Sequence, residues 1–199
     1  VEVIPIHSLN ARNFEVISTQ PIDGFRHHFK DIKLTNIMMD YEWVLPKLKN
    51  GQVDFIAGGL TLTPERTQKF RAAPAYRWIN ELLVFRQGNN WPQQLTDLTE
   101  PVIVSAHSSH AETLKRLSAE IPGLSYQEDP ELDADELLQK VVDGSINYTL
   151  TDSNQLAVNR RLFPQLTIGF TVSENLPVGW LLPKTQDDSL FSVLIEYFG

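Results

Sequence analysis

One pattern that occurs twice constrains the fold of this chain more than any other feature. An amphipathic helical run ends at an Asn-Gly pair at Gly51 and leads into the apolar run 53–57, and a second ends at an Asp-Gly pair at Gly144 and leads into the run 146–150. Glycine can adopt the left-handed backbone that closes a helix. Two such steps about 93 residues apart predict two similar α/β lobes, because a solenoid would need more copies at a period of about 20 to 50 residues. Helix, glycine and strand also follow one another in α/β folds generally, so the pattern alone fits other α/β arrangements too.

Alternating helices and short strands extend along the rest of the chain. Such alternation favours parallel sheets, which bind ligands beyond the carboxyl ends of their strands, so the residues just after positions 57, 104 and 150 are the first candidates for a site. We expect further strands at 14–19, 33–38, 82–85, 102–105, 166–170 and 178–182, and helices at 41–49, 64–70, 110–120, 134–142, 153–162 and 188–197.

Charge and composition exclude several classes of function. The 199 residues include 17 basic and 25 acidic ones, and a net charge of -8 disfavours binding to nucleic acid or to an anionic membrane surface. The absence of cysteine excludes disulfides, thiolate zinc sites and a cysteine nucleophile, and leaves the compartment open. No export signal is recognisable, so we expect any signal or lipid anchor to lie outside this sequence.

The first candidate binding segment follows the run 53–57. Gly58 and Gly59 allow close approach of the backbone to a ligand, and Thr61 offers a hydroxyl. Arg66, in the first turn of a helix that Thr63 caps, has a planar guanidinium that can bind a carboxylate through two hydrogen bonds. The alternative is a surface arginine beside an ordinary capped helix.

The second candidate segments follow the next two strands of this kind. Ser108 and Ser109 lie at a predicted helix N-terminus, which attracts anions. His107 and His110 suggest a metal, but two histidines without a third nearby ligand are more typical of solvated or capping residues. Asp152 either caps the next helix or receives a cationic group. Because no third ligand is near the two histidines in the sequence, we predict no metal site.

Enzyme signatures are absent from the chain. It contains no Gly-x-Ser-x-Gly, no Walker loop, no Gly-x-Gly-x-x-Gly and no His-Glu-x-x-His motif. We accordingly expect no catalytic residues, no cofactor and no enzymatic activity in this chain itself.

Two stretches carry a resemblance to known families. Residues 45–76, with Gly-Gly-Leu-Thr-Leu-Thr-Pro-Glu-Arg at 58–66 and Phe-Arg-Ala-Ala-Pro-Ala-Tyr at 70–76, resemble the periplasmic solute-binding proteins that take amino acids. Residues 143–153, 159–166 and 173–180 are similar to one branch, the membrane-bound lytic murein transglycosylase F family, which joins a solute-binding-like domain to a lysozyme-like domain. The resemblance extends over nearly the whole chain from residue 14.

The resemblance implies a fold and a division of the chain. It implies an α/β, two-lobed, periplasmic-binding-protein-like (type II) fold, with two sheets joined by a hinge that the chain crosses twice, near 82–87 and 176–182. Lobe 1 would comprise residues 1–86 and 177–199, and lobe 2 residues 87–176. The segment 19–24 is shorter than the family's loop, so either the pocket is more open or a mobile segment is missing.

The resemblance also implies roles for the candidate residues. Arg66, Thr61 and the backbone of Gly59 would bind the α-carboxylate of an amino acid, and Gly58 would also contact the ligand. Ser108 and Ser109 would close on the same carboxylate from the second lobe, and Asp152 would receive the α-ammonium.

The function that follows is that of a ligand-sensing domain. It would bind an amino acid or cell-wall peptide between the lobes and regulate a covalently attached peptidoglycan lytic transglycosylase domain, which we expect downstream of this chain. The parent would be periplasmic, anchored to the outer membrane by a segment outside this chain. The alternatives are a free amino-acid-binding protein of an ABC transporter and an enzyme of the cyclohexadienyl dehydratase type.

Overall fold

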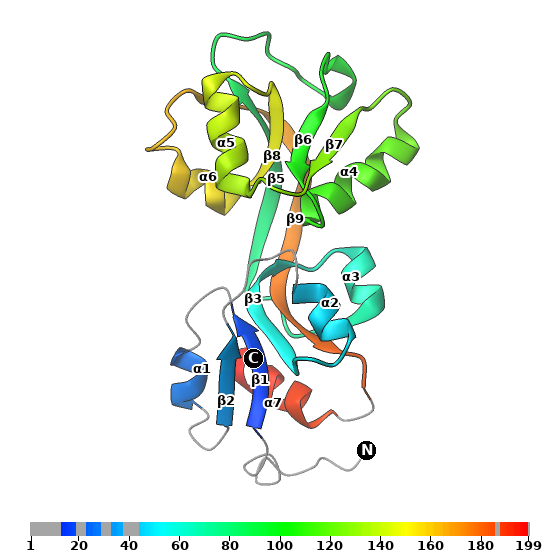
Figure 1. Cartoon of the computed structure of the whole chain (residues 1–199), viewed down its shortest axis with the longest axis vertical. Helices are drawn as coiled ribbons and strands as arrows, with labels where there is room; N and C mark the ends of the chain where they lie inside the picture. Colours follow the sequence, from blue (N-terminus) through cyan, green and yellow to red (C-terminus); the bar gives the residue numbers. More distant parts are fainter. Residues whose placement is uncertain (1–12, 19–22, 29–32, 38–43, 186–187, 199) are drawn as a thin grey trace. The chain divides into compact units, whose positions relative to one another are not determined.

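The chain folds into two compact units, which the computed structural model describes over residues 13–18, 23–28, 33–37, 44–185 and 188–198. The first unit comprises Val1–Trp78 and Pro177–Gly199, and the second comprises Ile79–Leu176. The chain passes between the units within two strands, β5 (Arg77–Arg86) and β9 (Leu166–Pro183) (Figure 1).

The first unit is built on a mixed sheet. Its strand order is β2 (Lys33–Ile37), β1 (Asn13–Ser18), β3 (Phe55–Thr61) and β9, with β4 (Phe70–Ala72) also paired to β9. β1 runs parallel to β2 and β3, whereas β9 runs antiparallel to β3 and β4. Its helices are α1 (Asp23–His28), α2 (Val44–Lys49), α3 (Pro64–Lys69) and α7 (Ser189–Phe198).

Aromatic side chains fill the core of the first unit. The rings of Phe55 and Trp180 stack with their centroids 5.7 Å apart, and the ring of Phe25 lies 5.5 Å from that of Trp180. Tyr197 of α7 packs edge-on against Phe25. Because each aromatic side chain removes a large apolar area from water, this cluster fixes α1 and α7 on the sheet.

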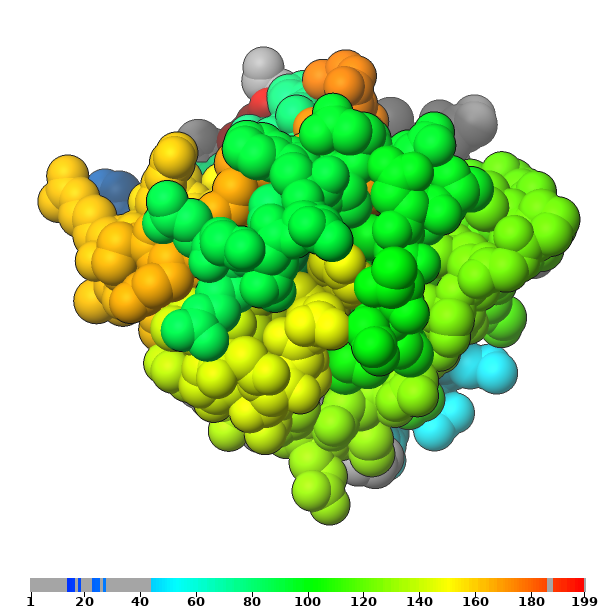
Figure 2. All heavy atoms as spheres, turned by 90° about the horizontal axis from the view of Figure 1, so that it is seen from above, coloured from blue at the N-terminus to red at the C-terminus, as the bar shows by residue number. Residues whose placement is uncertain are grey.

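The second unit has a four-strand path flanked by helices. Its strand order is β5, β8 (Tyr148–Asp152), β6 (Val102–Ser105) and β7 (Tyr126–Asp129), with β9 beside β5. β8 is antiparallel to β5, and β6 is parallel to both β7 and β8. The helices are α4 (Ser109–Glu120), α5 (Ala134–Asp143) and α6 (Ser153–Asn159). The segment that follows β5 contains a short 3-10 helix (Leu95–Asp97). This segment, drawn in green, covers part of the face seen in Figure 2.

Alternation along β5 divides the core of the second unit into two layers. Leu83 and Phe85 pack in one cluster with Leu114 of α4, whereas Leu82 and Val84 pack in the other with Leu138 of α5. Successive side chains of a strand point to opposite faces. Odd-numbered residues of β5 therefore face α4, and even-numbered ones face α5.

The duplicated pattern of the sequence is present in both units. The helix α2 is followed by Gly51 with φ 68°, and α5 ends at Gly144 with φ 84°. Both glycines have the left-handed backbone that the pattern predicts, and each is followed by a buried strand, β3 or β8. The predicted helix–strand steps are confirmed.

Several predicted boundaries differ from the observed ones. The predicted end of a strand at residue 57 is wrong, because β3 continues through both glycines to Thr61, with its register against β9 shifting between Ile56 and Leu60. The sheets are mixed rather than purely parallel, since the two strands that cross between the units pair antiparallel. Residues 166–170 and 178–182 belong to one long strand, β9, and β7 was not predicted. Predicted positions 19, 38 and 41–43 lie outside the described residues.

The division between the units also differs in position from the one expected. The expected first crossing lies after residue 86, whereas the observed boundary lies after Trp78. The reason is that Glu81 through Phe85 form a ladder with β8 and so belong to the second unit.

No helix in the described ranges has the length and apolar character needed to cross a bilayer.

Candidate functional site

The residues around α3 bring Arg66 back onto the end of β3. Thr63 caps the helix, its hydroxyl accepting a hydrogen bond from the backbone N–H of Arg66 at 3.3 Å, and Pro64 occupies the first turn. The guanidinium Nη1 of Arg66 donates to the backbone carbonyl of Thr61 at 3.2 Å. Arg66 is only 5% exposed, so it is not the surface arginine of the alternative interpretation.

The two glycines lie within a strand. Gly58 and Gly59 belong to β3, between the two positions where its register against β9 shifts. The carbonyl of Gly58 accepts a hydrogen bond from the hydroxyl of Tyr76 at 3.3 Å. Thr61, the last residue of β3, is buried. The structure thus gathers four predicted residues of the first unit, Gly58, Gly59, Thr61 and Arg66, within one strand and the first turn that follows it.

The serines of the second unit lie at the start of α4. Ser108 is the N-cap of this helix: its hydroxyl accepts from the N–H of Ala111 at 3.1 Å and donates to the carbonyl of Ser105 at 2.7 Å. Ser109 is the first helical residue and is buried. The hydroxyl of Ser108 therefore serves the helix, and the first-turn N–H groups of α4 are the polar groups that this end of the helix presents.

Asp152 ends β8 and begins α6, but its side chain makes no capping hydrogen bond to that helix. Its Oδ1 lies 2.9 Å from Nε2 of His110, in the first turn of α4. The His110 side chain is 10% exposed and that of Asp152 is 22% exposed. The interpretation of Asp152 as a simple cap is wrong, and His110 is a buried partner of a carboxylate rather than a solvated histidine.

Glu81, a residue that sequence reasoning missed, completes this group. In the ladder between β5 and β8 it stands directly opposite Asp152. It has no exposed surface, and neither of its carboxylate oxygens has a hydrogen-bond partner. Burial raises the pKa of Glu81, the His110 imidazole lowers it, and the carboxylate of Asp152 raises it further.

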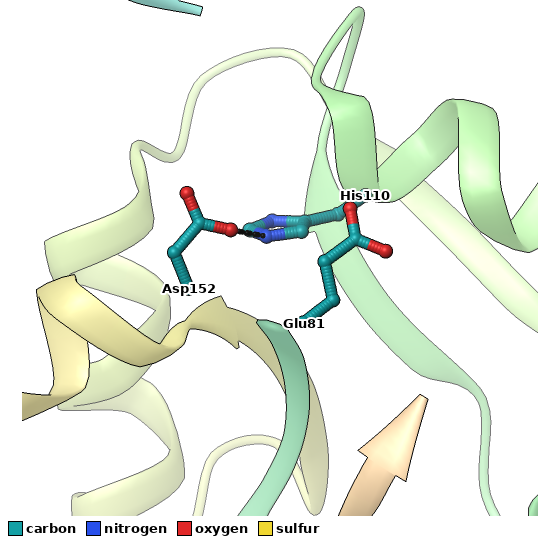
Figure 3. A group of neighbouring side chains, drawn as sticks. All are labelled: Glu81, His110 and Asp152. Atoms are coloured by element: carbon teal, nitrogen blue, oxygen red, sulfur yellow. Dashed lines mark hydrogen bonds and ion pairs between the residues drawn. The ribbon is translucent and has the colours of Figure 1, made fainter. Parts of the chain in front are cut away.

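Three titratable side chains therefore converge from β5, α4 and β8 (Figure 3). One ligand atom from each of Glu81, His110 and Asp152 lies within 4.8 Å of the others. Two carboxylates beside one imidazole attract positive charge, either a proton, a metal ion or a cationic group of a ligand. His107, the second histidine of the sequence motif, is exposed and is not part of the group.

A sequence signal for Glu81 did exist. The run Ile79 to Phe85 alternates between two buried faces, and Glu81 is the single charged residue in it. A lone acidic residue within a buried strand seldom remains without a functional or structural partner. His110 and Asp152 are 42 positions apart in the sequence, so only the fold brings them to Glu81.

Comparison with known proteins identifies the family to which this chain belongs. The model of the bacterial extracellular solute-binding proteins, family 3, matches residues 24–188. The chain belongs to this family. Its fold is the two-lobed, type II fold of periplasmic amino-acid-binding proteins: an ancestral arginine-binding protein bound to arginine has a TM-score of 0.77 at 20% identity, over 94% of this chain and 90% of that one. The arginine-bound form of truncated ArgBP from T. maritima has a TM-score of 0.78 at 16% identity, over 96% of this chain and 97% of that one.

Similar sequences are found in larger proteins that are named membrane-bound lytic murein transglycosylase F. The chain is 44% identical to the membrane-bound lytic murein transglycosylase F of Pseudoalteromonas translucida over 77% of this chain and 33% of the relative. It is 41% identical to that of Aliivibrio fischeri over 80% of this chain and 33% of the relative. The chain thus spans about a third of the length of these curated relatives, which are larger proteins with further parts.

Proposed function

We propose that this chain is the ligand-sensing domain of a periplasmic, membrane-anchored peptidoglycan lytic transglycosylase. It binds an amino acid or a cell-wall peptide, and this binding changes the activity of an attached catalytic domain. The relatives named as lytic murein transglycosylases support the identity of the parent protein, since they match over most of this chain. The solute-binding family supports a small-molecule ligand and an extracytoplasmic location.

The single observation that carries the binding proposal is the state of Asp152. A carboxylate at the start of a helix ordinarily caps it, yet that of Asp152 makes no cap and is 22% exposed. Its Oδ1 contacts His110, and the other oxygen, which points away from the ring in Figure 3, can receive a cationic group. In the other unit, the buried guanidinium of Arg66 lies at the end of a strand and satisfies the terminal carbonyl of that strand. We propose that Arg66 binds the carboxylate of the ligand and that Asp152 binds its ammonium group.

The test is calorimetric titration of the chain with free amino acids and with stem peptides of peptidoglycan, in the presence of a chelator. We expect Asp152→Asn to weaken binding by roughly 30-fold or more, because truncating one partner of a desolvated charge pair costs about 2 to 5 kcal/mol. Arg66→Lys keeps the charge but loses the planar fork, so it should weaken binding as well.

Lys69→Gln is the matched control, because Lys69 lies on the same short helix as Arg66 but is exposed and paired with Glu65. It should leave the affinity unchanged. Absence of binding by the unmodified chain to every amino acid and stem peptide would contradict the sensing proposal. For the regulatory part, glycan cleavage by the full-length parent should change when the ligand that the chain binds is added, and an unchanged rate would overturn it.

A further inference from the structure

Two acidic side chains are held on the same face of the sheet in the second unit. Glu81 and Asp152 are partners in the antiparallel ladder of β5 and β8, so their side chains project to the same side. The next positions on that face, Leu83 and Leu150, are buried in the apolar cluster with α4. Like charges directly opposite each other in a ladder are destabilising. The fold nevertheless places both carboxylates here.

Among the described residues, no lysine or arginine compensates for this pair. In the described part of the chain, neither Glu81 nor Asp152 forms an ion pair with a lysine or arginine, and the polar partner of Asp152 is His110. Glu81 has no accessible surface, and both its oxygens are unpartnered. Buried charges in proteins are paired with an opposite charge or coordinate a metal ion. In the view of Figure 3 the carboxylates of Glu81 and Asp152 lie on opposite sides of the His110 ring.

We propose that Glu81, His110 and Asp152 bind one divalent cation. Carboxylate oxygens and an imidazole nitrogen are ligands of Zn²⁺, and three protein ligands with a fourth, open position are typical of zinc sites that keep a water or ligand. Zn²⁺ is favoured over Mg²⁺ and Ca²⁺, because those ions prefer oxygen ligands only. The ion would neutralise the charge of the ladder and satisfy an oxygen of Glu81.

The geometry needs only a modest adjustment to hold such an ion. Zinc–ligand distances of about 2.0 to 2.2 Å place neighbouring ligand atoms of a tetrahedral ion about 3.4 Å apart. The three ligand atoms here lie within 4.8 Å of one another, and the pair from His110 and Asp152 is already at 2.9 Å. Side-chain rotations of Glu81 therefore have to close a gap of at most about 1.4 Å.

This metal site shares Asp152 with the proposed amino-acid site but needs only one of its two carboxylate oxygens. The oxygen Oδ1 of Asp152 faces His110, and the other oxygen points away from the ring in Figure 3. One oxygen can therefore bind the metal while the other remains for an ammonium group. The metal proposal requires no amino acid, and the amino-acid titration described above contains a chelator, so each can fail without the other.

The experiment is equilibrium dialysis of the chelator-treated chain against Zn²⁺, with bound metal measured by mass spectrometry and affinity measured by calorimetry. We expect one zinc ion per chain, and each of Glu81→Gln, His110→Gln and Asp152→Asn to weaken binding by about 100-fold or more, since losing even a residue behind a metal ligand typically costs about 10- to 100-fold. The amides keep the size of the side chains, and circular dichroism verifies that each variant is folded.

His107→Asn is the matched control, because His107 lies in the same loop, is exposed, and has φ 60°, a conformation that asparagine tolerates. Its zinc affinity should equal that of the unmodified chain. Three results would overturn the proposal: no zinc retained after dialysis, zinc retained equally by Glu81→Gln and Asp152→Asn, or zinc lost in His107→Asn. The last two would assign any bound zinc to surface histidines.

Discussion

The imidazole of His110 and the carboxylate of Asp152 are joined by a 2.9 Å contact between Nε2 and Oδ1 that links the start of α4 to the end of β8. This contact holds Asp152 away from the helix that it precedes, whose first turn it does not cap. It therefore keeps the carboxylate of Asp152 in the group that it forms with His110 and Glu81.

Glu81→Gln should stabilise the metal-free chain at neutral pH. The carboxylate of Glu81 is fully buried without a hydrogen-bond partner, and an amide removes its charge at nearly the same volume. We expect the free energy of unfolding, measured by urea denaturation in a chelator, to rise by about 1 to 3 kcal/mol. Glu128→Gln, at an exposed position of β7, should change it by no more than about 0.5 kcal/mol. A loss of stability in Glu81→Gln would show that neighbouring groups already stabilise the charge of the Glu81 carboxylate.

The two left-handed glycines give a second prediction, which concerns the duplicated pattern. Gly51→Ala and Gly144→Ala should each lower the free energy of unfolding by about 1 to 2 kcal/mol, because an L-residue with a side chain is strained at the φ values of 68° and 84°. A Cβ at Gly144 would also lie 3.2 Å from the guanidinium Nη1 of Arg86, whereas nothing lies near one at Gly51. Gln139→Ala, on the exposed face of α5, is the control and should be nearly neutral. Equal stability of all three variants would contradict the claim that Gly51 and Gly144 need a left-handed backbone to close their helices.

Asp143 gives a prediction for pH dependence. The hydroxyl of Ser145, 2.5 Å from Oδ1, and then the backbone N–H of Ser145 hold the pKa of Asp143 below its ordinary value. A depressed carboxyl pKa contributes stability that is present above the unfolded-state pKa and is lost as the pH falls through the folded-state value. In Ser145→Ala, which keeps the backbone donor, carboxyl NMR shifts should report a higher pKa for Asp143 than in the unmodified chain. An unchanged titration would contradict the assigned cause.

The sequence predicted the helix–glycine–strand steps and the helix start at Thr63, because glycine and capping residues act over a few neighbouring positions. It also predicted Arg66 and Asp152 as candidates from their places after strands. It did not predict that β3 continues through Gly58 and Gly59, since that continuation depends on pairing with β9, which is more than 100 positions away. The convergence of Glu81 with His110 and Asp152 was beyond reach for the same reason, because three segments distant in sequence form it.

The most direct test of the central claim, that Asp152 receives the ammonium group of a bound amino acid, pairs a ligand change with a residue change. The affinities of the amino acid that binds and of its analogue without the α-amino group are measured for the unmodified chain and for Asp152→Asn. We predict that the unmodified chain prefers the amino acid by at least about 30-fold, and that Asp152→Asn loses most of this preference. A preference of the same size in both proteins would contradict the claim, because the ammonium group would then be bound elsewhere.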